Sequence, residues 1–208
     1  MTRRAAWVTI FWIVAFDLSM TYPLFVPSPP LTWTGIEAAA ASYSQVPIWL
    51  SILPSLLLAP SFLWLVSCLH GETAPEHRHR TRLALALAAV YAALVGLNYT
   101  VQLTVVRAGM LSGETDGLAL WAMGNPHSIF WALEVVGYGF MGLAAAVAAP
   151  GLTSVAARRL FYANALIQVV ATAAYFVTVN PFHPLVLISL GIWGVTFPLA
   201  IGLLAKRT

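Results

Sequence analysis

The stretch VPIWLSILPSLLLAPSFLWLVSCL, residues 46–69, is predominantly apolar and contains no charged residue. A helix rises 1.5 Å per residue, so about 20 residues cross the hydrocarbon core of a bilayer, which is about 30 Å thick. This stretch therefore predicts a membrane-spanning helix. Five further stretches of similar length and composition are bounded by charged residues, Pro or Asn. The six predicted spans are 7–26, 46–69, 83–106, 127–149, 160–179 and 184–205.

The composition of the whole chain points to the same class. Hydrophobic residues make up 60% of the 208 residues, charged residues only 8%, and the mean hydropathy is +0.84. A soluble domain carries about 25% charged residues. A chain this apolar would aggregate in water, which excludes a soluble domain, a disordered tail and a nucleic-acid-binding protein. We expect one all-α integral membrane domain over residues 1–208, a polytopic bundle of six transmembrane helices.

The positions of the positive charges predict the orientation, because membrane proteins keep Lys and Arg mainly on the cytoplasmic side. With the N-terminus in the cytoplasm, nine of the ten Lys and Arg residues lie inside and only Arg107 lies outside. The nine are Arg3, Arg4, Arg78, Arg80, Arg82, Arg158, Arg159, Lys206 and Arg207. We therefore expect a multi-pass protein of the cell inner membrane, with both the N- and C-termini cytoplasmic.

Two external loops carry signals for short helices at the membrane surface. Thr34 and Glu37 have the S/T-x-x-E spacing of a capping box before an Ala run, which predicts an interfacial helix over 35–43. Asp116 is a candidate N-cap for one or two helical turns that end near Met123. We interpret both segments as lids over the bundle, in preference to gates for a substrate.

The loop between the second and third spans, residues 70–82, is the most strongly charged segment. It contains three His residues, but none of them has the spacing that fixes metal-ligand geometry. We therefore interpret it as a solvated cytoplasmic loop. Its cations, Arg78, Arg80 and Arg82, are expected to contact anionic lipid head groups of the bilayer.

Two carboxylates lie inside predicted spans. Asp17 is ten residues into the first span, about 15 Å from its cytoplasmic edge, and Glu134 is seven residues into the fourth, about 10 Å from its external edge. A charged side chain in hydrocarbon costs about 2.5–3.5 kcal/mol on insertion scales, so such a residue is by default a functional candidate. Either carboxyl can be kept protonated by desolvation, which makes a proton relay physically available.

Further polar residues lie at similar depth or toward the external side. Asn98 and Gln102 are four residues apart on one helix face, and Tyr138 follows Glu134 by the same interval. Residues nearer the outside are Arg107, His127 and His183. Together these side chains predict a polar pocket that is open to the external side. The alternative, which we favour for Asn98 and Gln102, is that they only hydrogen-bond helices together.

Two Asn-Pro motifs, Asn125-Pro126-His127 and Asn180-Pro181-Phe182-His183-Pro184, precede the fourth and sixth spans. Asn at an N-cap followed by Pro at the first helical position is a favourable helix start. His127 and His183 are also the one candidate pair of ligands for haem or a metal ion. No second pair lies deeper in the bilayer, so we expect no resident cofactor or metal.

Gly137, Gly139 and Gly142 give the fourth predicted span a side without bulky residues. Small residues allow two helix backbones to approach closely in a membrane. The three glycines therefore predict a close contact between the fourth span and a neighbouring helix.

The segment Leu97-Asn98-Tyr99-Thr100-Val101-Gln102, the external loop after it, and the Gly-rich span after Asn125-Pro126-His127 give the chain its overall pattern. In this layout the chain resembles a loose group of uncharacterised bacterial six-helix integral membrane proteins. The resemblance covers most of the chain and implies the same topology. It brings no established activity and no ligand.

Two kinds of function fit these features. The first is a small membrane protein that binds or transports a small solute in the external pocket, with Asp17 and Glu134 carrying a proton or cation. The second is an intramembrane enzyme in which Glu134 or Asp17 acts as general acid or base on a lipid-like substrate. The absence of a nucleophile–base set, an HExxH motif and a phosphate loop counts against the enzyme. A structural or assembly role is a third alternative.

Overall fold

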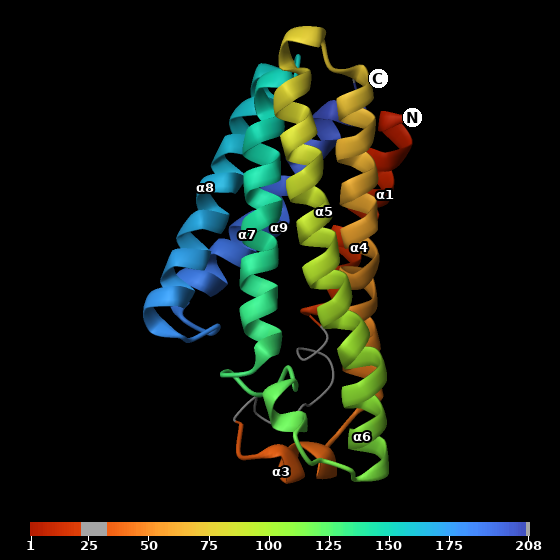
Figure 1. Ribbon diagram of the computed structural model, residues 1–208, viewed down its shortest axis with the longest axis vertical. Helices are drawn as coiled ribbons and strands as arrows, with labels where there is room; N and C mark the ends of the chain where they lie inside the picture. The colour runs from red at the N-terminus through yellow and green to blue at the C-terminus, as the bar shows by residue number, and fades with distance from the viewer. Residues whose placement is uncertain (22–32, 207–208) are drawn as a thin grey trace.

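The computed structural model describes residues 1–21 and 33–206, and its regular structure over these residues is helical (Figure 1). The longer helices are α1 (Thr2–Ser19), α4 (Gln45–Glu72), α5 (Arg78–Val101), α7 (Ile129–Ala148), α8 (Val155–Thr178) and α9 (Pro184–Ala205). The shorter ones are α3 (Ile36–Ala41) and α6 (Arg107–Ser112). A π-helical segment, Gln102–Val106, joins α5 to α6 without a break. Single 3₁₀ turns lie at Pro75–His77, Leu118–Leu120 and Ala149–Gly151.

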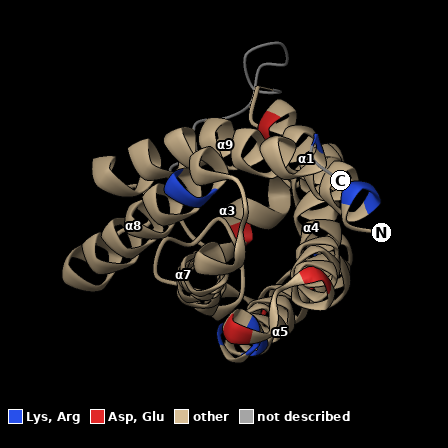
Figure 2. Cartoon of the chain, turned by 90° about the horizontal axis from the view of Figure 1, so that it is seen from above, with Lys and Arg blue, Asp and Glu red and all other residues tan. Residues whose placement is uncertain are grey.

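The six longer helices form a closed ring. Each helix contacts the next in the order α1, α4, α5, α7, α8, α9, and α9 contacts α1. Figure 2 shows this ring along the bundle axis, with the few charged residues set against an otherwise uncharged chain. Chain order and spatial order therefore agree, as is expected when short connections join antiparallel neighbours.

Five helical segments are long and apolar enough to cross a membrane: 45–72, 75–112, 129–151, 155–178 and 184–205. They correspond to the second to sixth predicted spans. The helix α1 differs because it has only 18 residues and carries Arg3, Arg4 and Asp17. Residues 22–26 of the predicted first span lie outside the described residues, as does Arg207. A sixth span thus stays a prediction.

The Asn residues of the two Asn-Pro motifs are not N-caps, which corrects the sequence-based prediction, although the second motif does open α9, with His183 as N-cap and Pro184 as the first helical residue. The Asn125 side chain accepts a hydrogen bond from the His127 backbone N–H at 3.0 Å, and α7 begins at Ile129. In the second motif Asn180 accepts from the Phe182 backbone N–H at 2.9 Å. Both Asn residues thus form the same local turn, because an Asn oxygen readily bonds a backbone N–H two residues on.

The two short elements in the loops are present, but their predicted caps are wrong. The N-cap of α3 is Gly35, with φ 125°, and no side chain caps this helix. Gly117, with φ 74°, precedes Leu118–Leu120 in the same way, so Asp116 is not a cap. At both starts the N-cap residue has a positive φ, which favours Gly, and no side chain caps the first turn.

The two ends of the bundle differ in charge. Both termini lie at one end, together with the turn that joins α4 to α5 and the turn that joins α7 to α8 (Figure 1). The Lys and Arg residues of the described chain, apart from Arg107, lie at these helix ends. We call this the cation end. The opposite end is covered by α3 and by Leu118–Leu120, which pack against Val106 and Met110 in a small apolar cluster, and we call it the lid end.

The interior of the bundle contains a closed cycle of five aromatic rings. Neighbouring ring centroids are 5.4–5.8 Å apart, and each of the five side chains is at least nine-tenths buried. In order, the cycle runs Phe62, Tyr91, Tyr138, Trp193 and Phe197, and Phe197 contacts Phe62. Four helices contribute to it, so the cycle ties α4, α5, α7 and α9 together by burial and edge contacts.

The glycines of α7 lie at close helix contacts, which confirms the prediction. A β-carbon on Gly137 would meet Val95 Cγ2 of α5 at 2.6 Å, and one on Gly142 would meet Gln168 Cβ of α8 at 2.7 Å. The glycines thus lie on two sides of α7, where they allow close contact with α5 and with α8.

Candidate functional site

Glu134 of α7 is held by two side chains from α5. Tyr99 Oη donates a hydrogen bond to Glu134 Oε1 at 2.5 Å, and Asn98 Nδ2 donates to Oε2 at 3.4 Å. Asn98 Nδ2 also donates to the Phe130 carbonyl oxygen at 3.1 Å. Among residues 1–21 and 33–206, both groups that donate to the carboxylate are uncharged. The structure therefore brings Glu134 and Asn98 together, as the sequence predicts, with Tyr99 as an additional donor.

Three buried oxygen atoms around Glu134 have no hydrogen-bond partner in the described part of the chain. They are Asn98 Oδ1, Tyr91 Oη and Tyr138 Oη. The Asn98 amide cannot be turned to relieve this, because its nitrogen already faces two acceptors, the Phe130 carbonyl and the Glu134 carboxylate. Leaving a buried polar group unpaired costs about 1–3 kcal/mol, so three of them together make this place a candidate site for a ligand or water.

The two tyrosine hydroxyls lie close to one another and to Glu134, but not in a geometry that makes a hydrogen bond. Their rings pack edge to face, with centroids 5.5 Å apart, in the aromatic cycle. We call Tyr91, Asn98, Tyr99, Glu134 and Tyr138 the Glu134 cluster. Its oxygens come from two adjacent helices and converge on one carboxylate in an otherwise apolar interior.

Gln102, predicted as a pocket residue, binds the lid. Its Nε2 donates to the Trp121 carbonyl oxygen at 2.7 Å, and its Oε1 accepts from the Met123 backbone N–H at 3.2 Å. Trp131 Nε1 donates to the Met123 carbonyl oxygen at 2.8 Å. The loop over the lid end is thus fixed to both α7 and the π-helical segment, one helical turn beyond Asn98.

Arg107 lies apart from Glu134. It is eight residues beyond Tyr99, about 12 Å along the helix. Its Nε donates to Gln45 Oε1 at 2.8 Å, and its guanidinium lies 5.6 Å from the centroid of the Trp49 ring. Burial raises the pKa of the nearby Tyr43 hydroxyl, and the positive charge of Arg107 opposes this rise.

Asp17 lies at a different helix contact. Its carboxylate packs against Gly194 of α9, where a β-carbon would be 2.7 Å from Oδ1. The structure therefore does not bring Asp17 to the partners of Glu134, which are on α5. The two predicted carboxylates occupy separate sites.

The two histidines have different surroundings. His183 is the N-cap of α9, and its Nδ1 accepts a hydrogen bond from the Leu185 backbone N–H at 3.3 Å. His127 is exposed in the turn that Asn125 makes. No three His, Cys, Asp or Glu side chains converge in a way that could hold a metal ion, as far as residues 1–21 and 33–206 are concerned.

At the cation end, Arg78 Nε donates to the Thr73 carbonyl oxygen at 3.4 Å, while Arg80 and Arg82 are exposed. These residues are placed where a head group could reach them. Their contact with anionic lipid stays a prediction.

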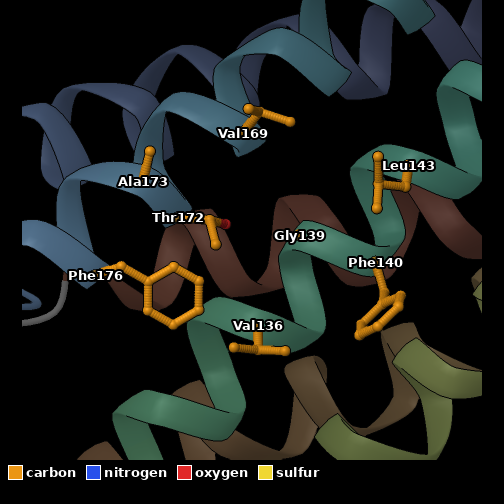
Figure 3. A pocket seen from close by; sticks show the side chains of 8 residues that line it. All are labelled: Val136, Gly139, Phe140, Leu143, Val169, Thr172, Ala173 and Phe176. Atoms are coloured by element: carbon orange, nitrogen blue, oxygen red, sulfur yellow. The ribbon is translucent and has the colours of Figure 1, made fainter.

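A separate apolar groove of about 280 Å³ lies between α7 and α8 (Figure 3). Its lining residues are Val136, Gly139, Phe140, Leu143, Val169, Thr172, Ala173 and Phe176. None of the predicted site residues lines it. The one polar side chain in the lining is that of Thr172, which donates to the Val135 carbonyl oxygen at 3.4 Å.

Sequence reasoning missed Tyr91 and Tyr99 as members of the site. Tyr99 stands next to Asn98 in the segment quoted for the resemblance. Tyr91 precedes Asn98 by seven residues, about two helical turns, which places Tyr91 on the same helix face as Asn98. The periodicity could have identified Tyr91. Its contact with Tyr138 depends on how α5 packs against α7, which the pattern does not specify.

The comparisons with known proteins identify no relative. No family model matches the chain, and searches of curated proteins and of solved structures find no significant match.

Proposed function

We propose that the chain is a multi-pass protein of the bacterial inner membrane that binds or transports a small solute at Glu134, with protonation of this carboxylate coupled to binding. The observation that carries the proposal is the convergence of three unpaired buried oxygens on a carboxylate whose donors are both neutral. A membrane protein that needed only helix contacts would be served by an amide at position 134, which costs less to bury.

We further propose that the cation end faces the cytoplasm and that α1 is a sixth span. The clustering of Lys and Arg at one end of the bundle supports this orientation through the positive-inside rule. Glu134 is then nearer the external side, and the solute reaches it from the lid end. Gln102, which binds the lid and lies one turn from Asn98, is on the route.

In this proposal Glu134 carries the proton and Asp17 has a separate role. Asp17 lies against Gly194, on the contact between α1 and α9, whereas the side chains that bind Glu134 belong to α5. Transport, as opposed to binding, requires the five aromatic rings to move, because they fill the interior next to Tyr138.

The test is dissipation of a pH gradient in proteoliposomes loaded with a pH-sensitive dye, in a buffer that contains Na⁺ and K⁺, with valinomycin holding the membrane potential constant. We expect the wild type to dissipate the gradient faster than empty liposomes and Glu134→Gln to match the empty liposomes. Glu76→Gln is the matched control because Glu76 is an exposed carboxylate in the loop at the cation end, and it should behave as the wild type. Equal rates for the wild type, Glu134→Gln and empty liposomes would refute the proton-coupled function.

A further inference from the structure

The charge of the Glu134 cluster limits what it can bind. In the described part of the chain both groups that donate to Glu134 are uncharged, and the nearest charged side chain on the α5–α6 helix, Arg107, lies eight residues beyond Tyr99, about 12 Å along the helix. The ionisable groups of the described chain that face Glu134 are Tyr91 and Tyr99 of α5 and Tyr138 of α7, which are neutral at physiological pH. A carboxylate in hydrocarbon without a cationic partner is stable only when a proton or a cation accompanies it.

The atoms around the carboxylate are oxygens. Asn98 Oδ1, Tyr91 Oη and Tyr138 Oη are buried without a partner in the described part of the chain, and Glu134 keeps lone pairs beyond those used by Tyr99 and Asn98. A site built from carboxylate, amide and hydroxyl oxygens suits a hard cation, whereas soft metals prefer sulfur and nitrogen ligands.

Charge and size then select a monovalent ion. One carboxylate neutralises one positive charge, so a divalent cation would leave a net charge inside the membrane, at the cost that burying a charge carries. The rings of Tyr91 and Tyr138 pack against each other and against Trp193 with centroids 5.4–5.5 Å apart, so the side chains that carry the hydroxyls are closely packed. An ion fits such a site better than a solute of many atoms.

We propose that the Glu134 cluster binds one Na⁺ ion through Glu134, Asn98 Oδ1 and the hydroxyls of Tyr91 and Tyr138, in exchange for a proton on Glu134. This inference rests on the proposed function at Glu134 and names its solute. The exchange is balanced, since one positive charge enters as the other leaves.

The experiment measures equilibrium binding of radiolabelled Na⁺ to the full-length protein in detergent, in a choline buffer. We expect saturable binding that unlabelled Na⁺ displaces, that falls as the pH is lowered, and that Glu134→Gln abolishes. Tyr138→Phe keeps the ring in the aromatic cycle and removes only the unpaired hydroxyl. It should weaken Na⁺ binding on the order of tenfold, equivalent to one lost ligand, while leaving thermal stability without Na⁺ unchanged or higher.

Tyr162→Phe is the matched control, because Tyr162 is exposed on α8 and should bind Na⁺ as the wild type does. The cation proposal is overturned if the wild type binds no Na⁺, if binding survives Glu134→Gln, or if Tyr138→Phe binds Na⁺ unchanged. If Na⁺ fails to bind while dissipation of the pH gradient still depends on Glu134, the proposed function stands without this solute. If the dissipation does not depend on Glu134, the proposed function fails whatever the Na⁺ result.

Discussion

The carboxylate of Asp17 lies against Gly194, with Oδ1 2.7 Å and Oδ2 3.0 Å from the point that a β-carbon on Gly194 would occupy. The approach of α1 to α9 at this level thus depends on a residue without a side chain. Asp17 is a neighbour of the α9 backbone here, while Glu134 is bound by side chains of α5. The two carboxylates that stand out in the sequence therefore lie in different environments: Asp17 packs against a helix backbone, and Glu134 accepts hydrogen bonds from side chains.

Gly194→Ala is expected to destabilise the protein by about 0.5–1.5 kcal/mol, because the added methyl group would overlap the Asp17 carboxylate and turn this side chain away from its rotamer. Gly191→Ala is the control on the same helix, since a β-carbon there meets nothing within 4 Å. Thermal unfolding in detergent measures both. The double variant Asp17→Ala/Gly194→Ala should recover most of the loss, and a failure to recover would show that Asp17 is not the obstacle.

Gly142→Ala should also be destabilising, since its methyl group would lie 2.7 Å from Gln168 Cβ and 3.4 Å from the Ala165 backbone of α8. The obstructing atoms belong to or adjoin the backbone, so they cannot swing aside, and a loss of about 1–3 kcal/mol is expected. Gly96→Ala, which meets nothing within 4 Å, should be neutral or slightly stabilising. Equal melting temperatures for the two variants would contradict the close packing of α7 against α8.

Gln102→Leu should loosen the lid, because it removes hydrogen bonds to the Trp121 carbonyl and the Met123 N–H. Losing these two hydrogen bonds should lower the free energy of opening the lid by about 1–3 kcal/mol. This predicts roughly tenfold faster proteolysis of the 113–128 loop. Thr104→Val is the control from the same π-helical segment, since Thr104 is exposed and bonds only its own helix at Thr100. Unchanged cleavage in Gln102→Leu would exclude its role in fixing the lid.

Tyr99→Phe should slow Glu134-dependent dissipation of the pH gradient by about tenfold or more, because a hydrogen bond to a charged group contributes about 1.5–3 kcal/mol. The ring would keep its contact with Phe130, whose centroid is 6.0 Å away, so the fold should survive. The measurement is the initial rate in proteoliposomes, normalised to the amount of folded protein. A wild-type rate would mean that the hydroxyl of Tyr99 has no part in the chemistry of Glu134.

The sequence predicted the apolar helices well, because a stretch of about 20 apolar residues has few other ways to satisfy its backbone in a membrane. It assigned the N-caps less well. Asn125 and Asn180 have the residue type of an N-cap, but each bonds the backbone two residues on and forms a turn. An Asn side chain supports both geometries, and only the following residues and their packing decide between them.

The site was predicted in part, and the division has a physical reason. Asn98 and Glu134 stood out because polar groups are rare in an apolar span, and they are hydrogen-bonded to one another. Gln102 lies on the same helical face but one turn nearer the lid end, where it bonds the backbone of Trp121 and Met123. Whether Asp17 and Glu134 would meet depended on the ring order of the helices, which hydrophobic patterning does not specify.

The central claim is that Glu134, and not Asp17, carries the proton. The most direct measurement compares Glu134→Gln with Asp17→Asn in the same proteoliposome assay, with Glu76→Gln as the control. We predict that Glu134→Gln falls to the rate of empty liposomes, while Asp17→Asn keeps the rate of the wild type when normalised to folded protein. Loss of dissipation in Asp17→Asn together with a wild-type rate in Glu134→Gln would contradict the account.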